Sequence, residues 1–298
     1  MRRAALPAAV AVLALGPAAG GAVAAQGEDG SLPRGSETVH LNPANFTTRI
    51  DNPYWPMKPG TRWVYRETDW EGARQRVVVT VTHRTKRIAN GITARVVRDV
   101  VTEKGQFVEV TDDWYAQDKR GNIWYLGEDT TEYENGKPVS KAGSFEAGVD
   151  GAQAGVIMPA HPRPGLAYRQ EYYKGEAEDK AAVITLGEER VQVPFGYFDK
   201  DILMTRDLVP TEPKVQELKF YAPNVGPLLS IHTDGDGGRA ELVDYSHTAS
   251  VSAAATTTPA ASNASPLAET GGAFPLTLLA PLAVLALGVL AVGVMRRG

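Results

Sequence analysis

Cysteine is absent from all 298 residues of the chain, which excludes disulfide bonds, thiolate nucleophiles and cysteine-ligated metal sites. The five histidines stand too far apart in the sequence for the His-x-His or His-Glu-x-x-His spacing of many metal sites. A Gly-x-Ser-x-Gly nucleophile turn and a phosphate-binding glycine loop are missing as well. We therefore predict no cofactor, no metal and no catalytic residue, and we favour a non-enzymatic protein over an enzyme.

Positive charge is scarce in the part of the chain that is expected to fold. All 35 acidic residues but only 27 of the 31 basic residues lie between residues 26 and 270, which gives that part a net charge of −8. Such a surface repels nucleic-acid phosphates, so we exclude nucleic acid as a partner. A convincing 3.6-residue periodicity is also missing there, which argues against long helices.

The first 25 residues have the three parts of a secretory signal peptide. Two arginines begin the segment, an apolar run follows, and small residues precede the polar Gln26. We expect cleavage at Ala24 or Ala25. A retained membrane anchor is the alternative, but prolines interrupt the apolar run, which is short for a span. Residues 26–38 are predicted to be disordered.

The C-terminal end consists of a short motif, an apolar segment and a positive tail. Residues 267–271 read Leu-Ala-Glu-Thr-Gly, residues 273–295 carry no charge, and residues 296–298 include two arginines. As a helix the apolar segment could cross a bilayer, with the tail in the cytoplasm. This order resembles the sorting signal of sortase substrates, in the LAxTG form that class E sortases of actinobacteria handle. The preceding Ala-, Ser-, Thr- and Pro-rich residues 249–266 are predicted to be an extended wall tether.

The resemblance implies a specific anchoring reaction. A sortase cysteine would attack the Thr270 carbonyl carbon, release Gly271 and everything after it, and pass the acyl group to an amine of a peptidoglycan precursor. Leu267 and Ala268 would fill an apolar groove of the sortase, and Glu269 occupies the variable position. The implied partners are a sortase, transiently, peptidoglycan, covalently, and the membrane before processing. The implied location is the cell wall at the cell surface, with a plain C-terminal membrane anchor as the alternative.

Residues 39–248 have the pattern of an all-β extracellular domain. Stretches rich in β-branched and aromatic residues alternate with a period of two, and Gly-containing turns separate them, most clearly at 103–106 and 134–137. About a dozen such strands predict one strongly curved antiparallel sheet, half-barrel or barrel-like, or else a sandwich. The Gly- and Pro-rich residues 144–165 are predicted to be a long loop.

Part of this domain resembles two groups of known proteins. The runs 191–198 and 221–226, with the closing pair Glu241-Leu242, are similar to a pattern in exported bacterial β-sheet proteins without an assigned function. The same runs resemble, more distantly, half-barrel carriers of the lipoprotein-localisation type. That second resemblance implies a curved sheet that cradles an acyl chain.

Two polar clusters are the candidate ligand-facing sites of the domain. The first lies near Trp124 and Tyr125 and the second contains two tyrosines, so both combine carboxylates with the aromatic side chains on which glycosidases stack sugars. A solvated hairpin with an acidic rim is the alternative interpretation. The residues are Glu128 and Asp129 in the first cluster, and Tyr172, Tyr173, Glu176, Glu178 and Asp179 in the second.

Asp234 and Asp236 are a weak candidate for a calcium site, because their carboxylate oxygens would suit a hard cation. A hairpin turn is the preferred interpretation of these residues.

The leading functional hypothesis is a wall-anchored surface protein whose β-domain binds an unknown ligand or envelope component. The alternatives are a carboxylate-dependent hydrolase of cell-wall glycans and a membrane-anchored structural protein of the envelope. An enclosed apolar cavity would favour a lipid carrier, and a solid core would not.

Overall fold

The computed structural model describes residues 31–69, 72–211, 213, 215–233 and 238–247. The predicted signal peptide, tether, sorting motif, apolar span, positive tail and calcium candidate all lie outside these residues. Within the described ranges, no helix is long and apolar enough to cross a membrane.

Strands dominate the described chain, in agreement with its period-two pattern and its lack of helical periodicity. The elements are η1 (Pro43–Asn45), β1 (Phe46–Thr47), β2 (Thr61–Asp69), β3 (Arg74–Arg87), β4 (Thr93–Glu103), β5 (Gln106–Asp118), β6 (Ile123–Glu134), β7 (Lys137–Ser140), β8 (Phe145–Glu146), β9 (Gln153–Met158), β10 (Ala167–Arg169), β11 (Glu171–Tyr172), β12 (Lys180–Leu186), β13 (Val191–Val193), β14 (Gly196–Phe198), β15 (Leu203–Leu208), β16 (Gln216–Ala222), β17 (Gly226–His232) and β18 (Gly238–His247).

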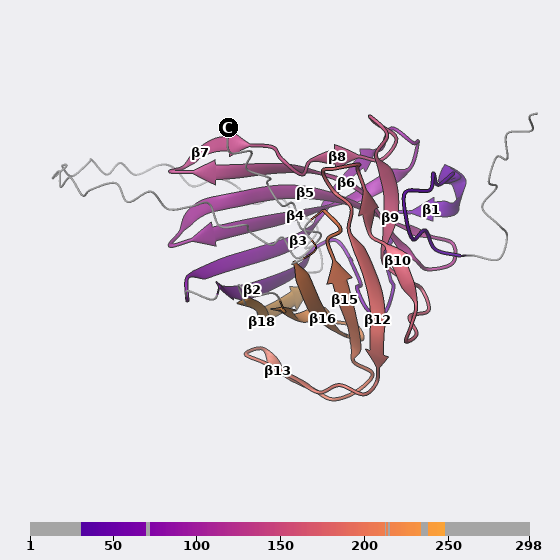
Figure 1. Ribbon diagram of the computed structural model, residues 1–298. Helices are drawn as coiled ribbons and strands as arrows, with labels where there is room; N and C mark the ends of the chain where they lie inside the picture. The colour runs from indigo at the N-terminus through magenta and orange to yellow at the C-terminus, as the bar shows by residue number, and fades with distance from the viewer. Residues whose placement is uncertain (1–30, 70–71, 212, 214, 234–237, 248–298) are drawn as a thin grey trace, which may run out of the picture. The chain divides into compact units, whose positions relative to one another are not determined.

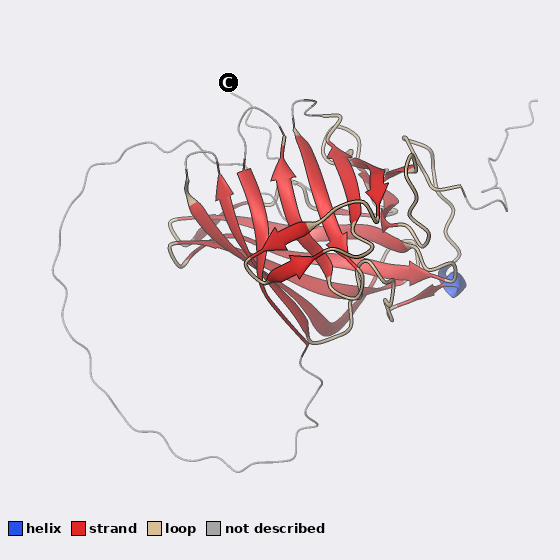
Figure 2. Ribbon diagram, turned by 90° about the horizontal axis from the view of Figure 1, so that it is seen from below, coloured by secondary structure: helices blue, strands red, loops and turns tan. Residues whose placement is uncertain are grey.

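Sixteen of these strands form a single sheet, whose main path is β10-β12-β15-β16-β17-β18-β2-β3-β4-β5-β6-β9-β11. Every pairing along this path is antiparallel. The sheet curls strongly around its own interior, as Figures 1 and 2 show. The prediction of one strongly curved, barrel-like antiparallel sheet is confirmed, and the sandwich alternative is wrong. The hairpin β13-β14 stands apart as a small two-stranded sheet.

Two predicted hairpin turns are confirmed at the ends of long strands. Lys104 and Gly105, with φ of 48° and 82°, join β4 to β5, and Asn135 and Gly136, with φ of 52° and 75°, join β6 to β7. Both central residues of such a two-residue turn need positive φ, which glycine adopts without strain and asparagine tolerates.

One short segment, residues 167–172, brings the two ends of the strand order together. Its first half, β10, pairs with β12, and its second half, β11, pairs with β9. We call this segment the seam. A Cβ atom on Gly155 of β9 would lie 2.2 Å from the carbonyl oxygen of Gln170. Only glycine therefore permits the close backbone approach that nearly closes the sheet.

The guanidinium of Arg169, which is fully buried, ties the seam to its surroundings. Its Nη2 donates to the Ala154 oxygen at 2.7 Å, and its Nη1 donates to the oxygens of Gly35 and Glu37 at 2.5 and 2.8 Å. Residues 33–37, which belong to the segment 26–38 predicted to be disordered, therefore make backbone contacts with the seam.

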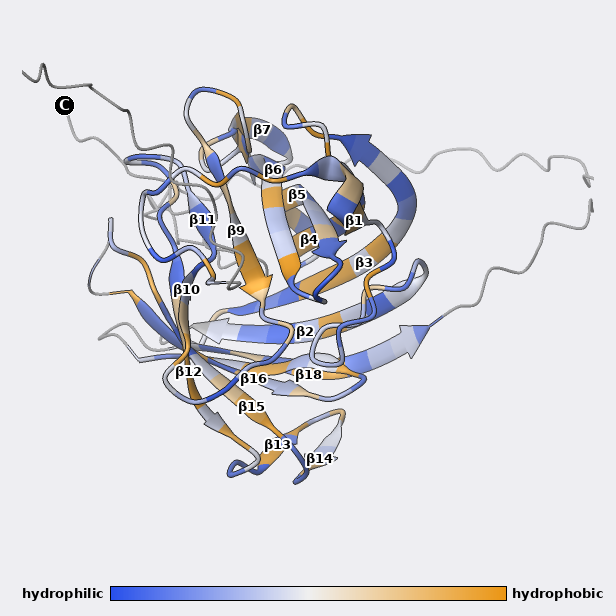
Figure 3. Cartoon of the chain, turned by 90° about the vertical axis from the view of Figure 1, so that its right-hand side faces the viewer, coloured by the Kyte–Doolittle hydropathy of each residue, from blue (hydrophilic) through white to orange (hydrophobic). Residues whose placement is uncertain are grey.

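The prediction of a long loop at residues 144–165 is wrong. This stretch contains β8 and β9, and β9 pairs with β6 on one side and β11 on the other. Residues 154–158 are all buried, and Figure 3 shows β9 as one of the most hydrophobic strands. A strand that is buried on both faces lacks the alternation of apolar and polar residues by which strands are recognised in a sequence. Glycine is also typical of loops, whereas Gly155 is needed here for the close approach of the seam.

Candidate functional site

Nine carboxylic acids are buried within the described domain, although acidic side chains are rarely buried without a partner. Only two basic side chains, Arg169 and Lys219, are buried with them in the described ranges. We call these nine residues the interior acids. They are Glu67, Asp99, Glu109, Asp113, Glu128, Glu171, Asp179, Asp207 and Glu217.

Strand β5 shows how the chain places acids inside. Glu109, Thr111 and Asp113 are each at most 2% exposed, while the alternating residues Val108 and Val110 are only partly buried. Alternate residues of a strand point to opposite faces of the sheet, so here the polar set faces inward and the valines face outward.

Asp113 and Glu128 form a carboxyl pair around one tyrosine. They lie directly opposite each other on β5 and β6, and the Tyr125 hydroxyl is 2.9 Å from an oxygen of each. Like charges in such a pair repel. Burial and the neighbouring acids raise the pKa of Asp113 to about 7 and hold the pKa of Glu128 well above its ordinary value, despite the hydrogen bonds with Tyr125. These upward shifts favour the protonated form of at least one member of the pair up to near-neutral pH.

Two more acids on β4 and β5 extend this proton-holding region. Burial raises the pKa of Glu109 to about 7, although Thr111 donates a hydrogen bond to it at 3.2 Å. Burial, and then the charges of Asp113 and Glu109, hold the pKa of Asp99 well above its ordinary value. The Oδ1 atom of Asp99 has no hydrogen-bond partner.

Glu171 places a further acid in the seam itself. Its side chain is 1% exposed, and neither carboxylate oxygen has a hydrogen-bond partner. Burial, followed by the charges of Asp179 and Glu128, holds the pKa of Glu171 well above its ordinary value. An ionised carboxylate without hydrogen bonds is costly in the interior, so the neutral form belongs to this conformation.

Lys219 on β16 compensates two of the interior acids. Its Nζ lies 3.0 Å from Asp207 Oδ2 and 3.0 Å from Glu217 Oε2. Burial by itself would lower the pKa of Lys219, but Asp207 and Glu217 raise it well above the ordinary value. This triad is a buried ion network, in contrast to the acids around Asp113, whose raised pKa values favour the protonated form. No group of three or more His, Asp or Glu residues in the described part of the chain is disposed to hold a metal ion.

The structure divides the two predicted polar clusters between the interior and the surface. Glu128 and Asp179 are interior acids, and both act on Glu171. Asp129 points outward and pairs with Lys141. A carbohydrate chain cannot reach Glu128 or Asp179 in this conformation, because they are 2% and 5% exposed.

The remaining members of the second predicted cluster lie outside the interior. Tyr172 and Tyr173 are partly buried, and Glu176 is exposed. Glu178 accepts a hydrogen bond from the Gly175 backbone at 2.9 Å, as expected for a residue that stabilises a turn. The structure thus brings two of the seven predicted polar residues, Glu128 and Asp179, to the same buried region.

An aromatic cluster fills the interior next to Asp99 and Asp113. Trp55 packs against Tyr115 and Tyr221, with ring centroids 6.2 and 5.9 Å apart. The hollow that remains among these rings and their neighbours measures about 10 Å³, room for a single water molecule. This part of the interior is too full for an acyl chain, so it gives no support to the lipid-carrier hypothesis.

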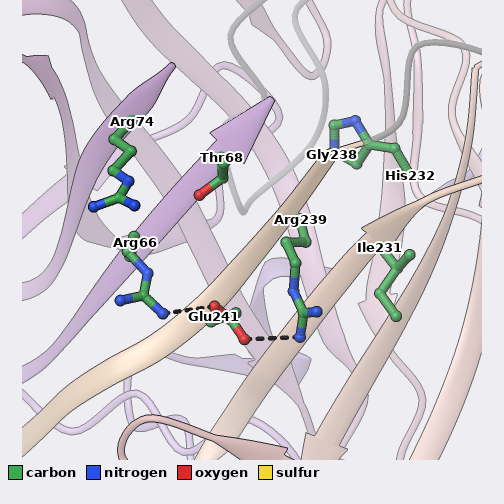
Figure 4. A pocket seen from close by; sticks show the side chains of 8 residues that line it. All are labelled: Arg66, Thr68, Arg74, Ile231, His232, Gly238, Arg239 and Glu241. Carbon is green, nitrogen blue, oxygen red and sulfur yellow. Dashed lines mark hydrogen bonds and ion pairs between the residues drawn. The ribbon is translucent and has the colours of Figure 1, made fainter. Parts of the chain in front are cut away.

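A second feature is an open hollow of about 460 Å³, lined by residues of the neighbouring strands β2, β3, β17 and β18. Figure 4 shows the side chains that line it. Arg66, Arg74 and Arg239 line it, and Glu241 lies between two of them. Glu241 accepts from Arg66 at 2.8 Å and from Arg239 at 2.7 Å. Arg74 makes no ion pair with a described residue. We call this site the cationic hollow.

Sequence reasoning missed both the interior acids and the cationic hollow. The Glu109-x-Thr111-x-Asp113 spacing was a usable signal for the first, because it places three polar residues on one face of a strand. The arginines of the hollow come from three strands, and Arg239 is distant in sequence from the other two. Nothing in the local pattern connects them.

Comparisons with known proteins add little. No protein-family description matches the chain, and no curated protein matches it. One solved structure, from Parabacteroides distasonis and provisionally described as a lipoprotein, covers 65% of this chain and 98% of its own length, with 16% identity and a TM-score of 0.35. A likeness this weak carries no functional argument.

Proposed function

We propose that the protein is exported, is anchored to the cell wall by a sortase, and displays a non-enzymatic β-domain that binds an anionic envelope ligand in the cationic hollow. The anchoring is supported by the order of motif, apolar segment and positive tail at the C-terminus. The binding is supported by three arginines that line one hollow with a single glutamate, on a chain whose residues 26–270 have a net charge of −8.

The cationic hollow suits a phosphate or carboxylate group. Guanidinium groups present paired N–H donors that match the oxygens of such anions. Glu241 neutralises one charge and fixes the positions of Arg66 and Arg239, while no described residue forms an ion pair with Arg74. A pre-positioned cationic surface loses less side-chain entropy when it binds.

A hydrolase acting on wall glycans finds less support. That reaction needs two carboxylates on either side of an accessible bond. The predicted carboxylates of the interior, Glu128 and Asp179, are both shut off from solvent, and Asp129 is exposed and pairs with Lys141.

Anchoring is tested by fractionating cells that express the full chain or its Thr270→Ala variant. We expect the wild type in the wall fraction released by muramidase and the variant in the membrane fraction, because the acyl-enzyme cannot form efficiently at the altered site. Identical partitioning of the two proteins would show that no sortase processes this motif.

Binding is tested separately, with inorganic polyphosphate as the probe and isothermal titration calorimetry as the measurement. Arg74→Glu reverses the charge of the arginine in the hollow that makes no ion pair with a described residue, so we expect affinity to fall at least about tenfold. Arg163→Glu, an exposed arginine in the loop before β10, is the matched control and should bind as the wild type does. Equal affinities for all three proteins would remove the hollow as the binding site.

A further inference from the structure

The seam makes more backbone contacts with one neighbouring strand than with the other. Toward β12, the pairs Ala167–Ala182, Tyr168–Ala181 and Arg169–Lys180 are followed by a hydrogen bond from the Gln170 N–H to the Asp179 oxygen at 2.8 Å. Toward β9 there are only two strand pairs, Glu171–Ala154 and Tyr172–Gln153, besides the Arg169 side chain. The β9 side is therefore the weaker side.

Glu171 occupies this weaker side with a buried carboxyl group. It is one of the two seam residues paired with β9, it is 1% exposed, and both of its carboxylate oxygens lack hydrogen bonds. In the neutral form the group is tolerated in the interior. In the ionised form it would lack every compensating hydrogen bond.

The groups that face Glu171 are mostly acidic. Asp179 precedes β12, Glu128 comes from β6 and Asp113 from β5, and Lys219 of β16 provides the opposing positive charge. Lys219 is itself engaged at 3.0 Å by Asp207 and Glu217. The hydroxyls of Tyr115 and Tyr125 are the other titratable groups coupled to Glu171.

Ionisation of these groups therefore concentrates negative charge at the seam. Asp99 and Glu109 add to this negative charge. Asp99 interacts electrostatically with Asp113, and Glu109 interacts with both Asp113 and Glu128. With Lys219 committed to its own triad, the repulsion can be relieved only by water entering or by the acids moving apart.

We propose that the seam is a proton-controlled closure. While Glu171 and the acids facing it hold their protons, β11 stays paired with β9 and the interior is shut. When these protons leave to solvent, repulsion and the demand for hydration release β11 from β9, and the acid-lined interior opens at this edge while the contact with β12 persists.

Hydrogen–deuterium exchange of the full chain, at about pH 5 and about pH 8.5 and corrected for intrinsic exchange rates, tests this closure. We expect exchange in peptides from residues 153–158 and 169–173 to increase at least about tenfold at the higher pH, with β3 and β4 remaining protected. Glu171→Gln keeps the shape of the side chain but cannot ionise, and it should reduce that increase strongly. Glu176→Gln, an exposed change nearby, should leave the increase intact.

Three results would overturn the proposal. Exchange at the seam that does not depend on pH would show that the interior protons do not control it. Uniform loosening of all strands would indicate global destabilisation in place of a local opening. An unchanged pH response in Glu171→Gln would show that ionisation of Glu171 does not control the opening. If that variant does not fold, the same exchange measurement on Glu128→Gln in β6 tests the proposal.

Discussion

Asp113 and Glu128 face each other across β5 and β6 with the hydroxyl of Tyr125 2.9 Å from an oxygen of each. A tyrosine hydroxyl has one proton and cannot donate it fully to two carboxylates. A second proton on one of the acids satisfies all three groups, because that acid can then donate to the tyrosine oxygen. The arrangement is therefore complete only in a protonated interior.

The first prediction is that the protein is more stable in mild acid than in mild base. The pKa values of Asp113 and Glu109 rise from 3.8 and 4.5 to about 7 on folding. Between those limits the folded state binds more protons than the unfolded state, so the free energy of unfolding falls as pH rises. This contribution is full below about pH 4 and lost as pH passes about 7. Calorimetry should show a Tm at least about 5 °C higher at about pH 5 than at about pH 8.

A matched pair of variants assigns that pH dependence to the interior. Asp113→Asn removes one of the titrating acids and should flatten the dependence of Tm on pH. Asp129→Asn changes an outward-facing neighbour paired with Lys141 and should leave the dependence unchanged. A Tm that is equal or higher in base for the wild type would contradict the prediction.

The second prediction concerns Lys219, the cation between Asp207 and Glu217. Lys219→Met leaves both acids buried without their charge partner, and we expect a loss of about 3–5 kcal/mol in the free energy of unfolding. Urea denaturation near neutral pH measures it. Lys200→Met, at an exposed bend, is the control and should cost little. A small effect at Lys219 would mean that the triad is not a stabilising network.

The third prediction tests the close approach at the seam. Gly155→Ala adds a Cβ atom 2.2 Å from the Gln170 carbonyl oxygen, a backbone atom that cannot rotate away. We expect a loss of about 1–3 kcal/mol or more, visible in urea denaturation. Gly196→Ala is the matched control, because its nearest neighbour would lie at 3.6 Å. Equal stability of the two variants would show that the approach at Gly155 is looser than described.

The general fold could be predicted from the sequence, but the face of the sheet that points inward could not. Hairpin turns such as Asn135-Gly136 and the period-two pattern are local properties of the chain. In β3 the residues on both faces of the strand include valines. Val78 faces outward, while Val77 and Val79 are buried. Local alternation therefore identified strands without identifying the core face.

The candidate sites depended on contacts that the sequence does not express. Glu128 and Glu171 meet only because the seam lies beside β9, and that proximity rests on Gly155, a residue typical of loops. The cationic hollow likewise needs β18 to lie next to β2. Such long-range pairings are set by closure of the sheet and have no local pattern.

The pairing of β2 with β18, with Thr61 opposite His247, has a consequence for biogenesis. The strand that must cover β2 is the last one described in the chain, so a nascent polypeptide has that edge bare until nearly the whole domain has been synthesised. Unpaired edges of this kind attract other strands. We expect productive folding to need an escort or rapid completion, and truncations before residue 238 to aggregate rather than to yield a smaller soluble domain.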